Sequence, residues 1–210
     1  MKKSFIIILF FALFFIVSNA MAKPELSFYL GKKDGSANSD GVTVIVIIEE
    51  GKGKATEVFN QHWKDLFWSD KFVVDLSNWS NKTITLNMTT DPGPARNTGW
   101  DWIIIGDAKI TDGNQMILDI GQAVASGQAK LSLLIDGEKA EMEGLAFGAN
   151  CTPDPGPCGG ETKPKSFMQH PAWDGKVGNT IARYEVQITA VDSVGKLATS
   201  WGKIKREITN

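Results

Sequence analysis

The sequence contains few of the residues from which catalytic and metal sites are built. Histidine occurs only twice, at His62 and His170, and neither lies in a metal-binding motif. The chain has no nucleophile elbow, zinc-protease motif, P-loop or dinucleotide-binding glycine loop. Pairs of carboxylates can be drawn from any chain with 24 acidic residues, so they do not by themselves indicate a glycoside hydrolase. We therefore expect a protein that is not an enzyme.

Clusters of positive charge are missing as well. Lysine and arginine together number 22, the formal net charge is -2, and the basic residues are spread along the chain. Proteins that bind nucleic acid or anionic membranes need a concentrated basic surface to contact phosphate groups. This composition argues against both kinds of partner.

Long apolar runs are confined to the N-terminus. A Met-Lys-Lys start precedes an apolar segment from Phe5 to Val17, and small residues follow as far as Ala22. This pattern is typical of a secretory signal peptide, and the apolar segment is too short for a good membrane span. We expect cleavage after Ala22 and export to the periplasm, the cell surface or the medium. The mature chain, residues 23–210, would then contain no membrane-spanning segment.

The only two cysteines, Cys151 and Cys158, lie in one loop that is rich in proline and glycine. In an exported protein, two cysteines this close predict a small loop-closing disulfide. Such a bond would stabilise the fold by about 2 kcal/mol on the chain-entropy model. Metal binding would need further ligands nearby, and the nearest histidine in the sequence is distant.

Short apolar segments bounded by turn residues indicate an all-β protein. Residues 83–90 alternate apolar and polar side chains, as expected of a half-exposed antiparallel strand. Residues 57–68 fit either a strand with a loop or a short helix, and residues 122–128 fit a helical turn. Short strands at this spacing predict one antiparallel β-sandwich of the jelly-roll kind. The strand patterns cover residues 26–30, 42–48, 71–76, 83–90, 102–110, 116–120, 130–135 and 180–188, with a last edge strand expected at 199–208.

The stretch from Thr89 to Ile110 combines a rigid Asp-Pro-Gly-Pro turn with a polar loop and two tryptophans. Proline fixes the backbone and glycine permits positive φ, so we expect an ordered loop. Trp100 and Trp102 would share one face of an extended segment, with Asp101 on the other. An aromatic pair beside an ordered loop suits sugar stacking, and it also suits the core of a sandwich.

Two blocks of sequence carry a family resemblance. The first contains LSFYLGKKDGSANSDGVTVIV, VDLSNW, ITLNMTTDPGP and TGWDWIIIGDAKI, and the second is SFMQHPAWDGKVGNTIARYEVQI. Together they resemble the NPCBM-type carbohydrate-binding modules and related jelly-roll domains of exported bacterial proteins. The resemblance implies a β-sandwich, often attached to glycan-active enzymes, that binds rather than catalyses.

The two blocks, residues 23–110 and 111–210, stand in the opposite order from those relatives. Two arrangements are open. In a circular permutant, Tyr184–Ile188 would lie beside Leu26–Leu30 within one chain. Alternatively, the last strand would complete the sheet of a neighbouring molecule and produce a homo-oligomer. Tethering within one chain favours the first arrangement.

Oxygen-bearing side chains at even spacings suggest a calcium site. Asp34, Asn38 and Asp40 lie in one loop, and Asp101 could supply a fourth ligand, since Ca²⁺ prefers several oxygen ligands. The spacing does not match an EF-hand. A polar loop stabilised by Asx turns would explain the same residues.

We expect glycans, or another cell-surface ligand, to bind to loop aromatics that have polar neighbours. Aromatic rings cover the apolar face of a sugar, and arginine or aspartate side chains bond its hydroxyls. Two alternatives remain: a structural or adhesive surface subunit that assembles by strand exchange and, less favoured, a glycan-active hydrolase. The candidate binding residues are Arg96, Trp100, Trp102, His170, Trp173 and Asp174. They form one site only if three loops converge.

Overall fold

The computed structural model describes residues 23–51, 53–140, 150–173 and 177–189. The predicted signal peptide, the predicted edge strand at 199–208 and Asp174 lie outside the described residues. None of the helices in these ranges is long and apolar enough to cross a membrane.

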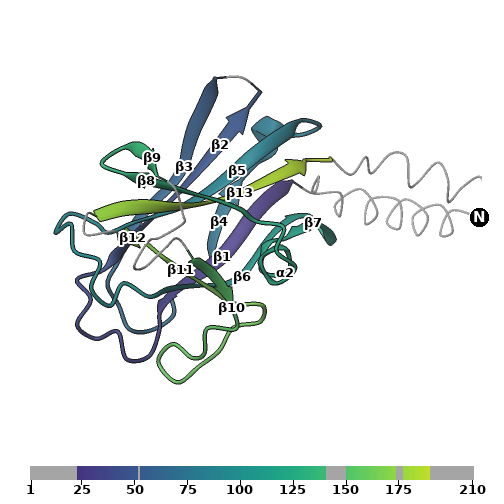
Figure 1. Ribbon diagram of the computed structural model, residues 1–210. Coiled ribbons are helices and arrows are strands. Elements are labelled where there is room, and N and C mark those ends of the chain that lie inside the picture. The colour runs from purple at the N-terminus through teal and green to yellow at the C-terminus, as the bar shows by residue number, and fades with distance from the viewer. Residues whose placement is uncertain (1–22, 52, 141–149, 174–176, 190–210) are drawn as a thin grey trace, which may run out of the picture.

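The protein is an antiparallel β-sandwich, as the sequence predicts. In Figure 1 two sheets pack face to face, with a short helix beside one of them. The first sheet has the order β10 (Asn150–Pro153), β11 (Phe167–His170), β6 (Ile103–Asp112), β1 (Pro24–Lys32) and β4 (Phe72–Asp75), with β7 (Gln115–Asp119) also paired to β6. The second has the order β3 (Lys54–Trp63), β2 (Val42–Glu50), β5 (Thr83–Asp91), β13 (Val177–Gln187), β8 (Lys130–Ile135) and β9 (Glu138–Ala140), with β12 (Ala172–Trp173) paired to β13.

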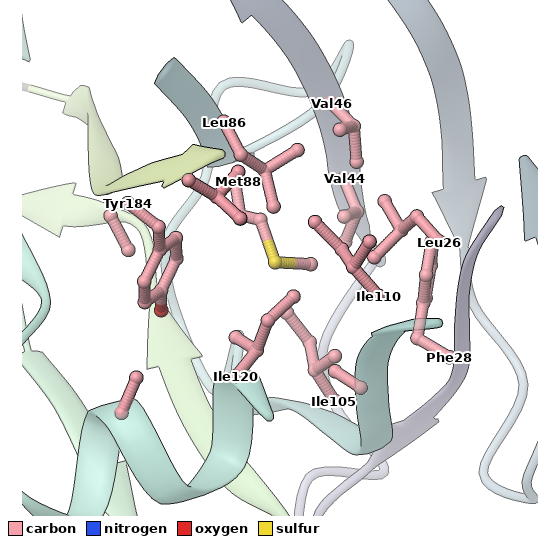
Figure 2. Close-up of a cluster of buried hydrophobic side chains, with 14 of the residues drawn as sticks. Leu26, Phe28, Val44, Val46, Leu86, Met88, Ile105, Ile110, Ile120 and Tyr184 are labelled. Carbon is pink, nitrogen blue, oxygen red and sulfur yellow. The ribbon is translucent and has the colours of Figure 1, made fainter. Parts of the chain in front are cut away.

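Alternation of apolar side chains along the strands forms one core between the sheets. In β2 every second residue is buried, from Val42 to Ile48, and in β1 the same holds for Leu26, Phe28 and Leu30. Figure 2 shows Leu26 and Phe28 of β1, Val44 and Val46 of β2, Leu86 and Met88 of β5, Ile105 and Ile110 of β6, Ile120 and Tyr184 gathered in this core. Burial of these side chains stabilises the fold by roughly 1.5–3 kcal/mol for each large one.

Two ambiguous segments are resolved by local structure. Residues 54–63 form strand β3, because the segment from Lys54 to Trp63 pairs antiparallel with β2, with a register shift that leaves Val58 without a partner in the ladder. The predicted helical turn is α2 (Ile120–Ala125), which begins where the Asp119 carboxylate accepts a hydrogen bond from the Gln122 amide. A 3₁₀ turn, η1 (Ser77–Trp79), follows β4.

Strand β13 lies inside the second sheet, and its neighbours differ from those expected. It pairs with β5 on one side and β8 on the other, whereas β1 pairs with β4 and β6 in the opposite sheet. The expected placement of Tyr184–Ile188 beside Leu26–Leu30 is therefore wrong. Side-chain alternation identified both strands, but it carries no information about which strands pair.

The predicted disulfide between Cys151 and Cys158 is also wrong, because the two cysteines are separate and free. Cys151 lies in β10, which is extended along β11 and packs against the main core. Cys158 lies in a bridge with Glu161, and its thiol donates a hydrogen bond to the carbonyl of Leu66. Spacing in the sequence suggested a closed loop, whereas strand pairing draws the two ends of the segment to different parts of the fold.

We predict that both thiols are present in the native protein and react slowly. Burial raises the pKa of Cys151 to about 12 and that of Cys158 to about 11, so little thiolate forms at neutral pH. A thiol reagent added without reductant should label both cysteines after denaturation but only slowly before it. Failure to label either one in the denatured, unreduced protein would contradict the free-thiol state.

Candidate functional site

Two loops that each run from one sheet to the other are in contact, and we name them for the residues that they contain. The SDG loop comprises residues 33–41 between β1 and β2, and the tryptophan loop comprises residues 92–102 between β5 and β6. The Lys33 amide donates to the Trp102 carbonyl at 2.9 Å, and the Ser39 hydroxyl donates to Asp101 Oδ1 at 2.7 Å. Two of the three loops expected to converge are therefore in contact, and part of the third, residues 174–176, lies outside the described residues.

The imidazole of His62 packs against both loops. Its Nδ1 lies 3.0 Å from Thr43 Oγ1, and its Nε2 lies 3.3 Å from the carbonyl oxygen of Asp40. Gly41 and Gly93 lie so close to the ring that a Cβ atom at either position would come within 2.7 Å of it. Both glycines have positive φ, so each is required by the backbone as well as by the approach of His62.

The carboxyl group of Asp101 is fully buried between the two loops. Burial raises its pKa to about 7, the nearby Asp40 acts in the same direction, and the Ser39 hydroxyl and Lys32 oppose the change. Asp101 Oδ2 and Asp40 Oδ1 are buried without a hydrogen-bond partner among the described residues. The two carboxyl groups thus share one enclosed environment.

Lys32 supplies the positive charge of that environment. Only 1% of this residue is exposed, and its Nζ donates a hydrogen bond to the Ser39 carbonyl at 3.1 Å. Burial lowers the pKa of the amine, and Asp101 and Asp40 act against that change. A lysine is almost never buried unless a charge of opposite sign compensates it. Lys32, Asp101 and the half-buried Asp40 therefore form a charge cluster where the SDG loop meets the tryptophan loop.

The tryptophan loop presents one indole to solvent. Trp100 has φ of 65° and is 48% exposed, and its ring centroid lies 5.2 Å from that of Trp102 in an edge-to-face contact. The chain turns sharply here, because the Trp102 amide donates to the Trp100 carbonyl at 2.8 Å. The Lys33 ammonium lies 5.4 Å from the Trp102 ring. The two tryptophans thus share a surface from which Asp101 points away.

The other predicted binding residues differ in their accessibility. Arg96 has φ of 53° and bonds Asp91 at 3.3 Å and the carbonyl of Val177 at 3.3 Å, which joins the tryptophan loop to β13. His170 is 7% exposed, and its pKa is lowered by burial, although the backbone of Pro171 and of Thr98 acts against this. His170 therefore has little surface for a ligand and instead interacts with the backbone of Thr98 in the tryptophan loop. Trp173 lies in β12.

The four predicted calcium ligands do not gather in one place. The Asp34 carboxylate accepts hydrogen bonds from the amides of Gly159 and Gly160, whereas Asp40 and Asp101 share the buried cluster with Lys32. No group of three or more histidine, cysteine or acidic side chains within the described ranges could hold a metal ion. The residues present fit Ca²⁺ poorly, because Lys32 already supplies a positive charge there. A calcium site remains a prediction from the sequence alone.

Sequence reasoning missed Lys32, Ser39 and His62. A signal for Lys32 was available, since it continues the inward alternation of Leu26, Phe28 and Leu30 along β1. The contacts of Ser39 and His62 join segments far apart in the chain, and no local pattern marks them.

The chain matches no protein-family model, and its comparison with curated proteins and with solved structures gives no significant match. The fold and the loop geometry define the class of protein as an antiparallel β-sandwich with an aromatic loop. The resemblance to carbohydrate-binding modules rests on the quoted sequence blocks alone.

We predict that Asp101→Asn flattens part of the pH dependence of stability. The pKa of Asp101 is raised in the fold, so the folded protein binds this proton more tightly than the unfolded chain, and stability decreases as pH rises from about 4 to about 7. A rise from 3.8 to about 7 corresponds to roughly 4 kcal/mol as an upper bound. Urea unfolding at pH 4.5 and pH 8 should show a smaller loss for the asparagine variant.

The exposed Asp70 provides the control, because Asp70→Asn also replaces one carboxyl group by an amide but does so outside the buried cluster. Parallel profiles for Asp101→Asn and the wild type would show that Asp101 ionises in the fold as it does in the unfolded chain.

We predict that Gly93→Ala is more destabilising than Gly35→Ala. Both glycines have positive φ, but a Cβ at Gly35 meets nothing within 4 Å, whereas one at Gly93 lies 2.5 Å from His62 Cε1. The left-handed backbone should destabilise both alanine variants by about 1–2 kcal/mol. Displacement of His62 should destabilise Gly93→Ala by roughly 1–3 kcal/mol more. Equal free energies of unfolding for the two variants would mean that His62 does not clamp the loops.

Proposed function

We propose that this protein is an exported, non-catalytic glycan-binding protein whose ligand stacks on Trp100 in the tryptophan loop. The signal-peptide pattern and the resemblance to carbohydrate-binding modules support export and glycan binding. The local geometry supports the choice of residue, because it favours Trp100 over the other tryptophans whose side chains are described.

The observation that carries the proposal is the conformation of Trp100. A left-handed backbone is uncommon for a bulky side chain and persists only where the surroundings enforce it. Here the surroundings are the buried Asp101 on one side and the ring contact with Trp102 on the other, and the result is an indole that is 48% exposed. An ordinary packing role would bury this ring.

The other tryptophans with described side chains are placed differently. Trp79 is buried, and Trp63 is half-buried against Phe72 at a centroid distance of 6.4 Å. Trp68 is half-buried beside Gly31 and Gly106, and its indole nitrogen donates to the Glu161 carbonyl at 3.1 Å. These three side chains stabilise the sandwich and its edges, which leaves the Trp100–Trp102 pair as the candidate platform.

Assembly by strand exchange is the less favoured alternative. The strand expected to be exchanged, β13, lies between β5 and β8 rather than at an edge. Its transfer to a neighbour would break two ladders of hydrogen bonds in each chain before they could be rebuilt. Light scattering on the protein at increasing concentration would reveal such an oligomer.

We predict that Trp100→Ala weakens binding to any glycan that the wild type captures on an array. Loss of one stacked ring should weaken binding by roughly ten-fold or more, since a buried aromatic contact contributes about 1.5–3 kcal/mol. Phe67→Ala is the matched control, because Phe67 is 68% exposed but belongs to another segment. Equal loss in both variants, or none in Trp100→Ala, would argue against this platform.

A further inference from the structure

Most charged groups around the tryptophan pair lie near a group of opposite charge. The Arg96 guanidinium lies 3.3 Å from the Asp91 carboxylate, so these two charges largely offset each other. Lys32 and Asp101 are buried, and the half-buried Asp40 acts on the same cluster. These five groups therefore present little net charge to a ligand that lies on the loops.

Lys33 is the exception. Its ammonium lies 5.4 Å from the Trp102 ring, and no carboxylate of the described residues lies within ion-pair distance of it. The adjacent acidic residue, Asp34, is directed to the amides of Gly159 and Gly160. The backbone of Lys33 is held by its bond to the Trp102 carbonyl. Within the described ranges, the positive charge of Lys33 thus stands beside the aromatic pair without a carboxylate at ion-pair distance.

We propose that the ligand is an anionic saccharide, with Lys33 as the residue that selects for its acidic group. This inference rests on the proposed function, because it assumes that a sugar stacks on Trp100. The two distances, 5.2 Å between the indole centroids and 5.4 Å from Trp102 to the Lys33 ammonium, place the charge beside the stacked ring or its neighbour in the polymer. A carboxylate or sulfate there gains a charged contact that a neutral hydroxyl group does not provide.

A preference for acidic sugars would come from a local contact with Lys33 and not from the net charge of the protein. The protein as a whole carries a net charge of -2, so it does not attract polyanions in general. A preference for acidic sugars must therefore come from a local contact. The ring beneath the Lys33 ammonium also limits the directions from which an anion can approach it.

The test compares polygalacturonate with its methyl-esterified form, which has the same backbone without the charge. Dextran sulfate and dextran form a second pair that separates sulfate from carboxylate. Affinity electrophoresis or calorimetry should show that the wild type prefers the acidic member of at least one pair. Lys33→Gln should remove that preference by weakening acidic binding roughly two- to five-fold, the range for one exposed ion pair, without changing neutral binding.

Lys54→Gln is the control, because Lys54 is exposed at the far end of the β2–β3 hairpin from the SDG loop. Equal binding of acidic and neutral members, unchanged by Lys33→Gln and lost in Trp100→Ala, would overturn the inference and leave the proposed function standing. Acidic preference that is lost equally in the Lys54 and Lys33 variants would show general charge attraction and overturn it too. No binding of any polymer would count against the proposed function itself, and the inference would fail with it.

Discussion

The hydrogen bond from Ser39 to the buried carboxyl of Asp101 is the contact on which the candidate site depends. It joins a loop between β1 and β2 to a loop between β5 and β6, so it connects both sheets of the sandwich. Asp101 is fully buried, so a carboxyl deprived of Ser39 would lose a partner that water cannot easily replace. Such a loss costs about 1–3 kcal/mol. The loops are therefore held together by a contact whose loss would destabilise the fold.

Burial of this contact also disfavours the charged form of Asp101, and the positive charge of Lys32 reduces that effect. Desolvation disfavours the charged forms of Asp101 and Lys32, whereas their mutual attraction favours both. Burial has the larger effect on each, since the pKa of Asp101 is raised and that of Lys32 is lowered. The cluster is therefore electrostatically costly, and it is better explained by the loop arrangement that it specifies than by a gain in stability.

The sequence predicted the strands and the sandwich better than it predicted which segments pair with one another. Alternating apolar residues predicted β5, because inward side chains on a half-buried strand must repeat every second residue. A nearly continuous β-branched run predicted β2, which was expected to be buried on both faces, whereas only every second residue of it is buried. Apolar residues at Ile181, Val186 and Ile188 predicted β13. The partners of β13 and the separation of Cys151 from Cys158 could not be predicted in this way. Both depend on long-range pairing, and a local pattern is compatible with several pairings.

The same distinction applies to the candidate site. The Asp-Pro-Gly-Pro turn and the tryptophans marked the tryptophan loop as ordered, and alternation along β1 could have identified Lys32 as inward-facing. The contacts of Ser39 with Asp101 and of His62 with the two loops span large sequence separations, 62 residues for the first. Such contacts appear only once the sheets are assembled.

Order in the tryptophan loop bears directly on the binding that we propose for Trp100. A flexible loop must lose conformational entropy when a ligand immobilises it, at about 0.5–1.5 kcal/mol for each side chain that is fixed. Here Trp100 is already held by its turn and by Trp102, and Arg96 is already held by Asp91 and Val177. The ordering cost is thus met during folding, where the core of the sandwich offsets it. A single exposed indole on such a loop can contribute more to affinity than the same side chain on a mobile one.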